Sequence, residues 1–262
     1  PGAGRDNHYG FINYTSALAA DRVYFNSDYH RQSFLQALPN FLKQFPDHTG
    51  LQMLPRLQER TQVLPLGLDL ERLNAAQAVK SEGPPIILWN HRWEYDKGPQ
   101  LFFQTLFELD QKGIDFRLVV LGPSFRRVPP IFKEARARLA HKLLHWGYAE
   151  SEQEYARWLQ QAHFLPVTSN QDFFGISVVE ALYCGCYPLL PMRLAYPEHV
   201  PQALWGDYFY DSDLQFKQQL EALLAARPVP GIHAELTDFV KRYDWRRLAP
   251  LYDEQFNQLV YG

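Results

Sequence analysis

Between residues 86 and 190, short apolar runs alternate with longer segments of helical periodicity. The apolar runs cover 86–90, 116–121, 143–146, 164–168 and 187–190, and the helical segments cover 99–111, 130–141, 151–161 and 176–184. Strands that alternate with helices pair in parallel, and the helices cover both faces of the sheet. The alternation therefore predicts an α/β fold with a parallel sheet, which binds ligands at the carboxyl ends of its strands.

The composition is that of a globular protein with a small net charge. The chain has 262 residues, 46% of them hydrophobic, and can bury one large or two ordinary cores. A net charge of −3 provides no broad basic field, so nucleic-acid binding would depend on a local patch. Cys184 and Cys186 are too few for a metal site and poorly placed to pair, which indicates reduced packing residues. Without a signal peptide or a long apolar span, we expect a cytoplasmic protein with no membrane partner.

A loop with a glycine and a carboxylate follows the apolar run 164–168. Asp172 begins this loop, Gly175 allows a tight turn, and Glu180 lies in the helix that follows. The free N–H groups of a helix start favour an anionic group, so the loop suits a phosphorylated ligand. The residues from Ser177 to Glu180 also fit a capping box. The residues alone leave open whether Glu180 serves a ligand or its own helix.

A second polar loop follows the apolar run 86–90. It carries Arg92 and Lys97 and leads into Gly98 and Pro99, and proline suits the first position of a helix. A guanidinium offers a bidentate fork and an ammonium a mobile point charge, a pairing that suits a diphosphate. The alternative is that both side chains form surface ion pairs with the neighbouring acids.

The amino-acid sequences of these loops are similar to those of a known family. The segment from Asp172 to Glu180 resembles the acidic signature of retaining GT-B glycosyltransferases, in which two glutamates flank a Phe-Gly turn. Here Asp172 takes the place of the first glutamate. The runs 89–94, 173–175 and 180–188 resemble the tRNA-queuosine mannosyltransferase family and its bacterial relatives. The resemblance extends from about Tyr9 to the C-terminus.

The resemblance implies a role for each matching residue. Arg92 and Lys97 would bind the diphosphate of a nucleotide-sugar, and Glu180 would hold its ribose. Asp172 would hold the transferred sugar, together with the N–H groups of the following turn, which are those of Phe173, Phe174, Gly175 and Ile176. The catalytic residues would then be Asp172, Arg92 and Lys97.

Two further strand ends complete the expected donor site. Gly122 follows the run 116–121, where a glycine either admits a nucleotide or forms a plain turn. The backbone at Gly147 and Tyr148 would meet the nucleobase by resemblance, and Trp146 beside them suits a core role as well as a stacking one.

The implied reaction is transfer of mannose from GDP-mannose, with queuosine in a tRNA as the acceptor. Neither a cofactor nor a metal ion is expected, because Arg92 and Lys97 would take up the charge on the leaving diphosphate. Two alternatives remain open: a GT-B sugar-nucleotide epimerase, and a nucleotide-sugar binding module without catalysis.

The resemblance also implies two Rossmann-like domains. Residues 1–76 would be the C-terminal portion of the acceptor-side domain, and 77–85 the linker. Residues 86–235 would bind the donor, and 236–262 would form a helix that crosses back. Because the first residue is Pro1, we expect the natural protein to begin upstream, with its acceptor-side histidine there.

Basic residues and histidines supply the remaining hypotheses. A cluster of basic residues would either contact the tRNA backbone or form a solvated helix face. Its members are Arg126, Arg127, Lys133, Arg136, Arg138, His141 and Lys142. His8, His91 and His145 are potential acid or base groups.

Overall fold

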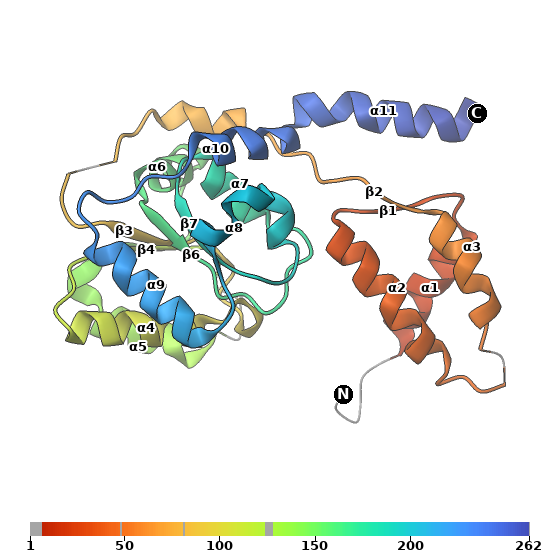
Figure 1. Ribbon diagram of the computed structural model, residues 1–262, viewed down its shortest axis with the longest axis horizontal. Coiled ribbons are helices and arrows are strands. Elements are labelled where there is room, and N and C mark those ends of the chain that lie inside the picture. The colour runs from red at the N-terminus through yellow and green to blue at the C-terminus, as the bar shows by residue number, and fades with distance from the viewer. Residues whose placement is uncertain (1–6, 48, 81, 124–127, 262) are drawn as a thin grey trace. The chain divides into compact units, whose positions relative to one another are not determined.

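The computed structural model describes residues 7–47, 49–80, 82–123 and 128–261, which are drawn as ribbons in Figure 1. The chain forms two compact units. The first consists of Pro1–Leu66 with Leu248–Gly262, and the second of Gly67–Arg247. The division falls after Leu66, so the segment 77–85, which we expected to link two domains, lies inside the second unit.

Packing explains the position of this division. A short 3-10 helix, Glu71–Ala76, lies against α6 (Glu152–Gln161) in the second unit. Its Leu73 is fully buried, and the Leu73 carbonyl accepts a 2.6 Å hydrogen bond from Gln160 Nε2. The same amide group accepts a 2.6 Å bond from the backbone N–H of Ala78. These residues therefore belong to the core of the second unit.

The described residues of the second unit form a six-stranded parallel sheet, as the alternation predicted. The strand order is β5-β4-β3-β6-β7-β8. The strands are β3 (Ile86–Trp89), β4 (Arg117–Leu121), β5 (Leu143–Gly147), β6 (Phe164–Pro166), β7 (Tyr187–Pro191) and β8 (Phe209–Tyr210). Strands β3 and β6 are neighbours in the sheet although they are far apart in the chain. The loops after these two strands therefore emerge side by side.

Helices cover both faces of this sheet (Figure 1). On one face lie α4 (Pro99–Gln111), α5 (Pro130–Arg138) and α9 (Asp213–Ala225). On the other lie α6, α7 (Ile176–Tyr183) and α10 (Ala234–Val240). The remaining helices are α8 (Trp205–Tyr208) and α11 (Trp245–Tyr261), which begins in the second unit and ends in the first. Both faces of the sheet are thus buried, which explains the uninterrupted apolar strands.

Aromatic side chains build the core on the α4 and α5 face. Trp89 of β3 is fully buried, and its ring centroid lies 4.9 Å from that of Phe102 and 5.6 Å from that of Phe132. Trp93 stacks on Phe132 at 4.7 Å, and Trp146 packs against the same cluster. Of the two roles considered for Trp146, the structure supports the one in the core.

The first unit combines helices with a two-stranded parallel sheet of β1 (Val23–Phe25) and β2 (Thr61–Val63). Its helices near the N-terminus are α1 (His8–Ala19), α2 (Asp28–Leu42) and α3 (Leu54–Glu59). Ser27 begins α2 and accepts a bond from the His30 N–H, which is the helix start that Ser27 favours. Leu38, Leu42 and Leu57 form the core with Tyr14 and Ala17.

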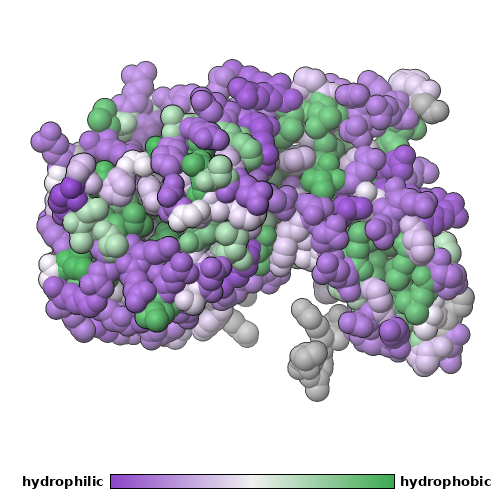
Figure 2. Space-filling model, viewed as in Figure 1, coloured by the Kyte–Doolittle hydropathy of each residue, from purple (hydrophilic) through white to green (hydrophobic). Residues whose placement is uncertain are grey.

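Most of the surface visible in Figure 2 is hydrophilic, with small apolar areas between the polar ones. Within the residues that the structure describes, no helix has both the length and the apolar character required to span a membrane.

Candidate functional site

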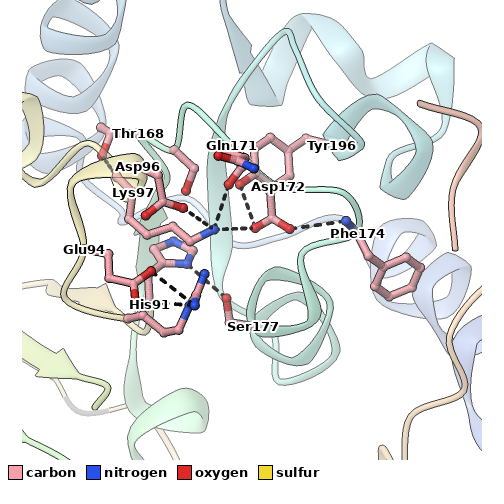
Figure 3. A network of polar contacts seen from close by, with 12 residues as sticks. His91, Glu94, Asp96, Lys97, Thr168, Gln171, Asp172, Phe174, Ser177 and Tyr196 are labelled. Carbon is pink, nitrogen blue, oxygen red and sulfur yellow. Dashed lines mark hydrogen bonds and ion pairs between the residues drawn. The ribbon is translucent and has the colours of Figure 1, made fainter. Parts of the chain in front are cut away.

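The two polar loops meet because β3 and β6 are neighbours. Lys97 comes from the loop after β3, and its Nζ lies 3.2 Å from Asp172 Oδ2, in the loop after β6 (Figure 3). The same ammonium donates a 2.8 Å hydrogen bond to the carbonyl of Gln171. A third contact, from the Asn170 N–H to the Asp96 carbonyl at 2.7 Å, ties the loops together. The sheet thus joins two residues that the sequence analysis placed in one site.

Lys97 is buried, with 7% of its surface exposed. A buried ammonium requires paired charges, and Asp96 Oδ2 lies 3.5 Å away in addition to Asp172. The chain continues into Gly98, whose φ is +66°. A Cβ there would stand 2.2 Å from the Thr168 carbonyl oxygen, so a glycine is needed where the loops cross.

Arg92, the second cation expected to bind the diphosphate, is exposed, whereas Lys97 is buried. Its side chain is 53% exposed, and its Nη1 lies 3.2 Å from Glu94 Oε2, which is the surface ion pair considered as the alternative. Arg92 also lines an open pocket of about 590 Å³ with Lys97, Asp172 and Phe173. An exposed pair of this kind contributes only about 0–1 kcal/mol. The guanidinium can therefore exchange Glu94 for an anionic ligand at little cost.

Asp172 organises the turn that follows it. Its Oδ1 accepts a 3.2 Å hydrogen bond from the Phe174 N–H, and its Oδ2 accepts one from Tyr196 Oη at 3.3 Å. The turn reaches Gly175 with φ +91°, where a Cβ would come within 3.1 Å of the Tyr196 ring. Phe173 is partly exposed at this turn, whereas Phe174 is buried.

A buried histidine supports the same turn from behind. His199 Nε2 contacts the carbonyl oxygen of Phe174, and its Nδ1 lies 2.9 Å from Tyr243 Oη. Burial lowers the pKa of His199 to about 4, so the ring is neutral at neutral pH. With one proton on the ring, Nε2 donates to the carbonyl and Nδ1 accepts from the tyrosine. Sequence reasoning missed His199, because nothing near it in the chain indicates this contact.

Helix α7 begins directly after the turn. Gly175 is its N-cap and no side chain caps it, so the capping box considered for Ser177 and Glu180 is not formed. Ile176, the first helical residue, is partly exposed. The alternative that Glu180 serves only as a cap is therefore wrong.

Glu180 instead lies in a buried network with two residues that the sequence analysis did not identify. Arg72 Nη2 donates to its Oε1, and Tyr155 Oη donates a 2.7 Å hydrogen bond to its Oε2. Burial raises the pKa of Glu180, while the bond from Tyr155 and the charge of Arg72 oppose the increase. Burial also raises the pKa of Tyr155 well above its usual range. Arg72 lies in the segment that we expected to precede the linker.

A pocket of about 630 Å³ extends from Glu180 past the ends of β4 and β5. It contains three of the residues expected to bind the donor: Gly122, Tyr148 and Glu180. Gly122 has φ +114°, and a Cβ there would stand 2.2 Å from the His91 carbonyl oxygen. Beside Gly147, whose φ is +131°, no described atom apart from those of the adjoining residues lies within 4 Å of the place that a Cβ would take. Tyr148 is exposed.

The three histidines named from the sequence lie in different surroundings. His91 is buried, with Nδ1 3.0 Å from Ser177 Oγ, and burial with the Lys97 charge lowers its pKa to about 4. His145 Nε2 lies 3.2 Å from the Gly147 carbonyl oxygen. His8 belongs to α1 of the first unit.

Several residues of the basic cluster form ion pairs with neighbouring acids. Arg138 lies 2.8 Å from Glu134 and over the ring of Phe107, and His141 lies 3.0 Å from Asp110. Lys142 is buried near Asp110 and Asp115, whereas Lys133 and Arg136 are exposed on α5. Arg126 and Arg127 lie outside the described residues.

The cysteines and the acidic groups supply no second site. Both cysteines are free; Cys186 is buried, donates to the Leu159 carbonyl at 3.1 Å, and has its pKa raised by burial to about 11. Among the described residues, no group of three or more His, Cys, Asp or Glu could hold a metal ion.

Comparison with known families matches both units. Residues 1–68 match the family described as tRNA-queuosine alpha-mannosyltransferase N-terminal, and residues 71–200 match glycosyl transferases group 1. The chain is 35% identical over 206 residues to a tRNA-queuosine alpha-mannosyltransferase of Drosophila melanogaster, a match that covers 76% of this chain and 54% of that protein.

A second relative is the GDP-mannose:cellobiosyl-diphosphopolyprenol alpha-mannosyltransferase of Xanthomonas campestris. It is 24% identical over 202 residues, which cover 76% of this chain and 53% of that protein. The chain thus spans about half the length of the curated relatives it matches.

Solved glycosyltransferase structures share the fold. Sucrose-phosphate synthase from Thermosynechococcus elongatus superposes with a TM-score of 0.73 at 16% identity, covering 98% of this chain and 62% of that one. Anabaena HepE, solved in complex with UDP and glucose, gives a TM-score of 0.71 at 14% identity, covering 97% and 68%. At such identities the likeness concerns the fold alone, and it confirms the expected GT-B type.

Proposed function

We propose that the protein transfers mannose from GDP-mannose to an acceptor with retention of configuration, on the ground of its similarity to group 1 glycosyl transferases over residues 71–200 and to a tRNA-queuosine alpha-mannosyltransferase. The observation that carries the proposal is the meeting of the two polar loops. Lys97 joins Asp172 at 3.2 Å, and Arg92 lines the same open pocket. Two cations beside a helix start suit a diphosphate, which is common to nucleotide-sugar donors.

The charges in this pocket support a reaction that generates an anion. When the bond between the sugar and the diphosphate breaks, its electron pair stays on the leaving oxygen, and negative charge develops there. Lys97 and Arg92 would stabilise that charge, as preorganised donors do in many enzymes. Asp172 and the turn 173–176 would hold the sugar while the acceptor hydroxyl oxygen bonds to it, and the proton of that hydroxyl would pass to the leaving diphosphate oxygen. No metal ion is required by this assignment, and metal independence stays a prediction.

The remaining donor contacts fall along the second pocket. Glu180 would hold the ribose, Gly122 would let the nucleotide approach the backbone, and Gly147 with Tyr148 would meet the base. The acceptor that we propose is queuosine in tRNA, because the relative of Drosophila melanogaster carries that name. We propose a cytoplasmic location on the same ground.

A calorimetric titration of this chain with GDP, UDP, ADP and GDP-mannose tests the proposal. We expect GDP and GDP-mannose to bind more tightly than UDP and ADP, and Arg92→Ala to weaken both. Lys133→Ala is the matched control, because Lys133 is an exposed cation on α5 that lies outside both pockets. No affinity for any of the four ligands would contradict the donor-site assignment.

A second measurement separates the transferase from a sugar-nucleotide epimerase. GDP-mannose incubated with the protein in the absence of an acceptor should keep its sugar configuration, which product analysis can follow. Appearance of a different hexose would favour the epimerase. Mannose transfer to queuosine-containing tRNA, and its absence with tRNA that lacks queuosine, would identify the acceptor.

A further inference from the structure

Asn90 is a buried polar residue that no part of the proposed site uses. It follows β3 directly, it is 6% exposed, and it lines the same pocket as Glu180, Gly122 and Tyr148. Its Oδ1 is buried without a hydrogen-bond partner among the described residues. A buried acceptor that lacks a partner is unfavourable, so a ligand that supplies a donor gains from meeting it.

The orientation of the Asn90 amide is determined by its other end. Nδ2 donates a 2.7 Å hydrogen bond to the carbonyl oxygen of Ser177, in the first turn of α7. The flipped amide would place two acceptor oxygens against each other, which is unfavourable. Oδ1 is therefore the end of the amide that lacks a partner among the described residues.

An acceptor oxygen restricts the chemistry of that ligand. A diphosphate at neutral pH offers acceptors and negative charge, so it does not bond to Oδ1. A hydroxyl or an N–H group does. Asn90 is thereby distinguished from Arg92, two residues later, which suits the anionic part of the same donor.

The sheet order indicates which part of a nucleotide lies at Asn90. Asn90 follows β3 and touches α7 one turn before Glu180, whereas Gly147 and Tyr148 follow β5, two strands away. Neighbouring strands lie about 4.8 Å apart, which puts the ends of β3 and β5 about 10 Å from each other. A base near β5 and a diphosphate near Lys97 leave the ribose between them, beside Asn90.

We propose that Asn90 Oδ1 accepts a hydrogen bond from a ribose hydroxyl of the donor nucleotide, next to Glu180. This inference rests on the proposed donor site. It adds a hydrogen bond to the ribose of the nucleotide, by which the protein distinguishes ribose from deoxyribose. Glu180 already accepts from Arg72 and Tyr155, so Asn90 supplies an acceptor that no group of the described residues occupies.

The test is to measure, by calorimetry, the affinities of GDP, 2′-deoxy-GDP and 3′-deoxy-GDP for the unaltered chain and for Asn90→Ala. We expect one of the two deoxynucleotides to bind the unaltered chain about fivefold more weakly than GDP, the size of one neutral hydrogen bond. In Asn90→Ala this preference for GDP should largely disappear.

The matched control is Asn257→Ala, which removes an exposed asparagine of α11 and should leave all three affinities unchanged. A uniform loss for the three nucleotides in Asn90→Ala would overturn the inference, because it is the result of a structural role through Ser177. Equal binding of all three nucleotides to the unaltered chain would overturn it as well, without any need for a folded variant. In both cases the proposed function stands. If the unaltered chain binds none of them, the proposed function falls and this inference falls with it.

Discussion

Asp172 and Glu180 lie eight positions apart, and each is held by one cation and one tyrosine, but with different geometry. Asp172 meets Lys97 at 3.2 Å and Tyr196 at 3.3 Å, in a loop that borders an open pocket. Glu180 meets Tyr155 at 2.7 Å and Arg72 in close contact, inside a helix, with its side chain 8% exposed. By the lengths of these contacts, the Asp172 network is therefore loose, and the Glu180 network is tight.

The difference between the two networks suits two different steps of the proposed reaction. Where bond breaking and charge development would occur, a loose network allows side chains to exchange partners for a ligand. At the proposed nucleoside end, a tight network would keep the pocket in one shape before the ligand arrives, which would reduce the cost of ordering on binding.

Lys97→Ala should have the largest effect on both stability and donor binding. Removing one partner of a buried ion pair costs about 3–5 kcal/mol, because the other charge stays buried. We expect a free energy of unfolding lower by about 3 kcal/mol in urea titrations, since Tyr196 still contacts Asp172. Lys112→Ala, which breaks an exposed pair with Glu221, should change the stability by less than about 1 kcal/mol. Similar losses in the two variants would contradict the burial argument.

Tyr155→Phe and Tyr196→Phe compare the two carboxylates directly. Each substitution removes one hydroxyl and keeps the ring. A hydrogen bond to a charged group contributes about 1.5–3 kcal/mol, and longer bonds contribute less. We expect a loss of about 2 kcal/mol for Tyr155→Phe and about 1 kcal/mol for Tyr196→Phe in urea unfolding at pH 7. A larger loss for Tyr196→Phe would reverse the contrast between the tight and the loose network.

Acid should lower the free energy of unfolding through the buried histidines near Asp172. The pKa of His199 is lowered to about 4 from an ordinary value of 6.5, and that of His91 likewise. The unfolded chain then binds more protons than the folded one between pH 6.5 and 4, so stability is complete above this window and falls as the pH decreases through it. Each histidine should cost about 1 kcal/mol between pH 6.5 and 5.5. Glu180, whose pKa is raised, acts in the opposite direction.

Urea titrations across this window check the slope. His199→Gln should flatten the dependence of the unfolding free energy on pH, because the substituted side chain does not titrate. His141→Gln, which replaces an exposed histidine paired with Asp110, should keep the full slope. An unchanged slope in His199→Gln would show that this histidine is not the source of acid sensitivity.

Arg92→Ala should have the smallest effect on stability and a clear one on binding. Arg92 is 53% exposed and pairs only with a neighbouring glutamate in the described part of the chain, so its loss should change the unfolding free energy by less than about 0.5 kcal/mol. A charge-assisted contact to a phosphate contributes about 1.5–3 kcal/mol, so GDP should bind at least tenfold more weakly. Loss of stability without loss of affinity would assign Arg92 a structural role.

Local periodicity was sufficient to predict the strands β3 to β7 and the helices α4 to α7. These elements are long and apolar enough for their pattern to show in the sequence. The positions of Lys97 and Asp172 after the carboxyl ends of strands followed from the same pattern, whereas the pairing of β3 with β6 did not. The strand β8, of two residues, was not predicted, because a segment this short carries little periodicity. The segment 236–262 was expected to form one helix, but the structure divides it into α10 and α11.

The partners of the site residues depended on the tertiary structure. Tyr155 is 25 positions from Glu180 and Arg72 is 108, and no spacing rule connects residues so far apart. The same holds for Tyr196 and His199 around the Asp172 turn, and for the bond from Asn90 to Ser177. Sequence patterns report which face of an element is buried. Which side chains meet there is decided when the elements pack, because hydrogen bonds and ion pairs form only within a few ångströms.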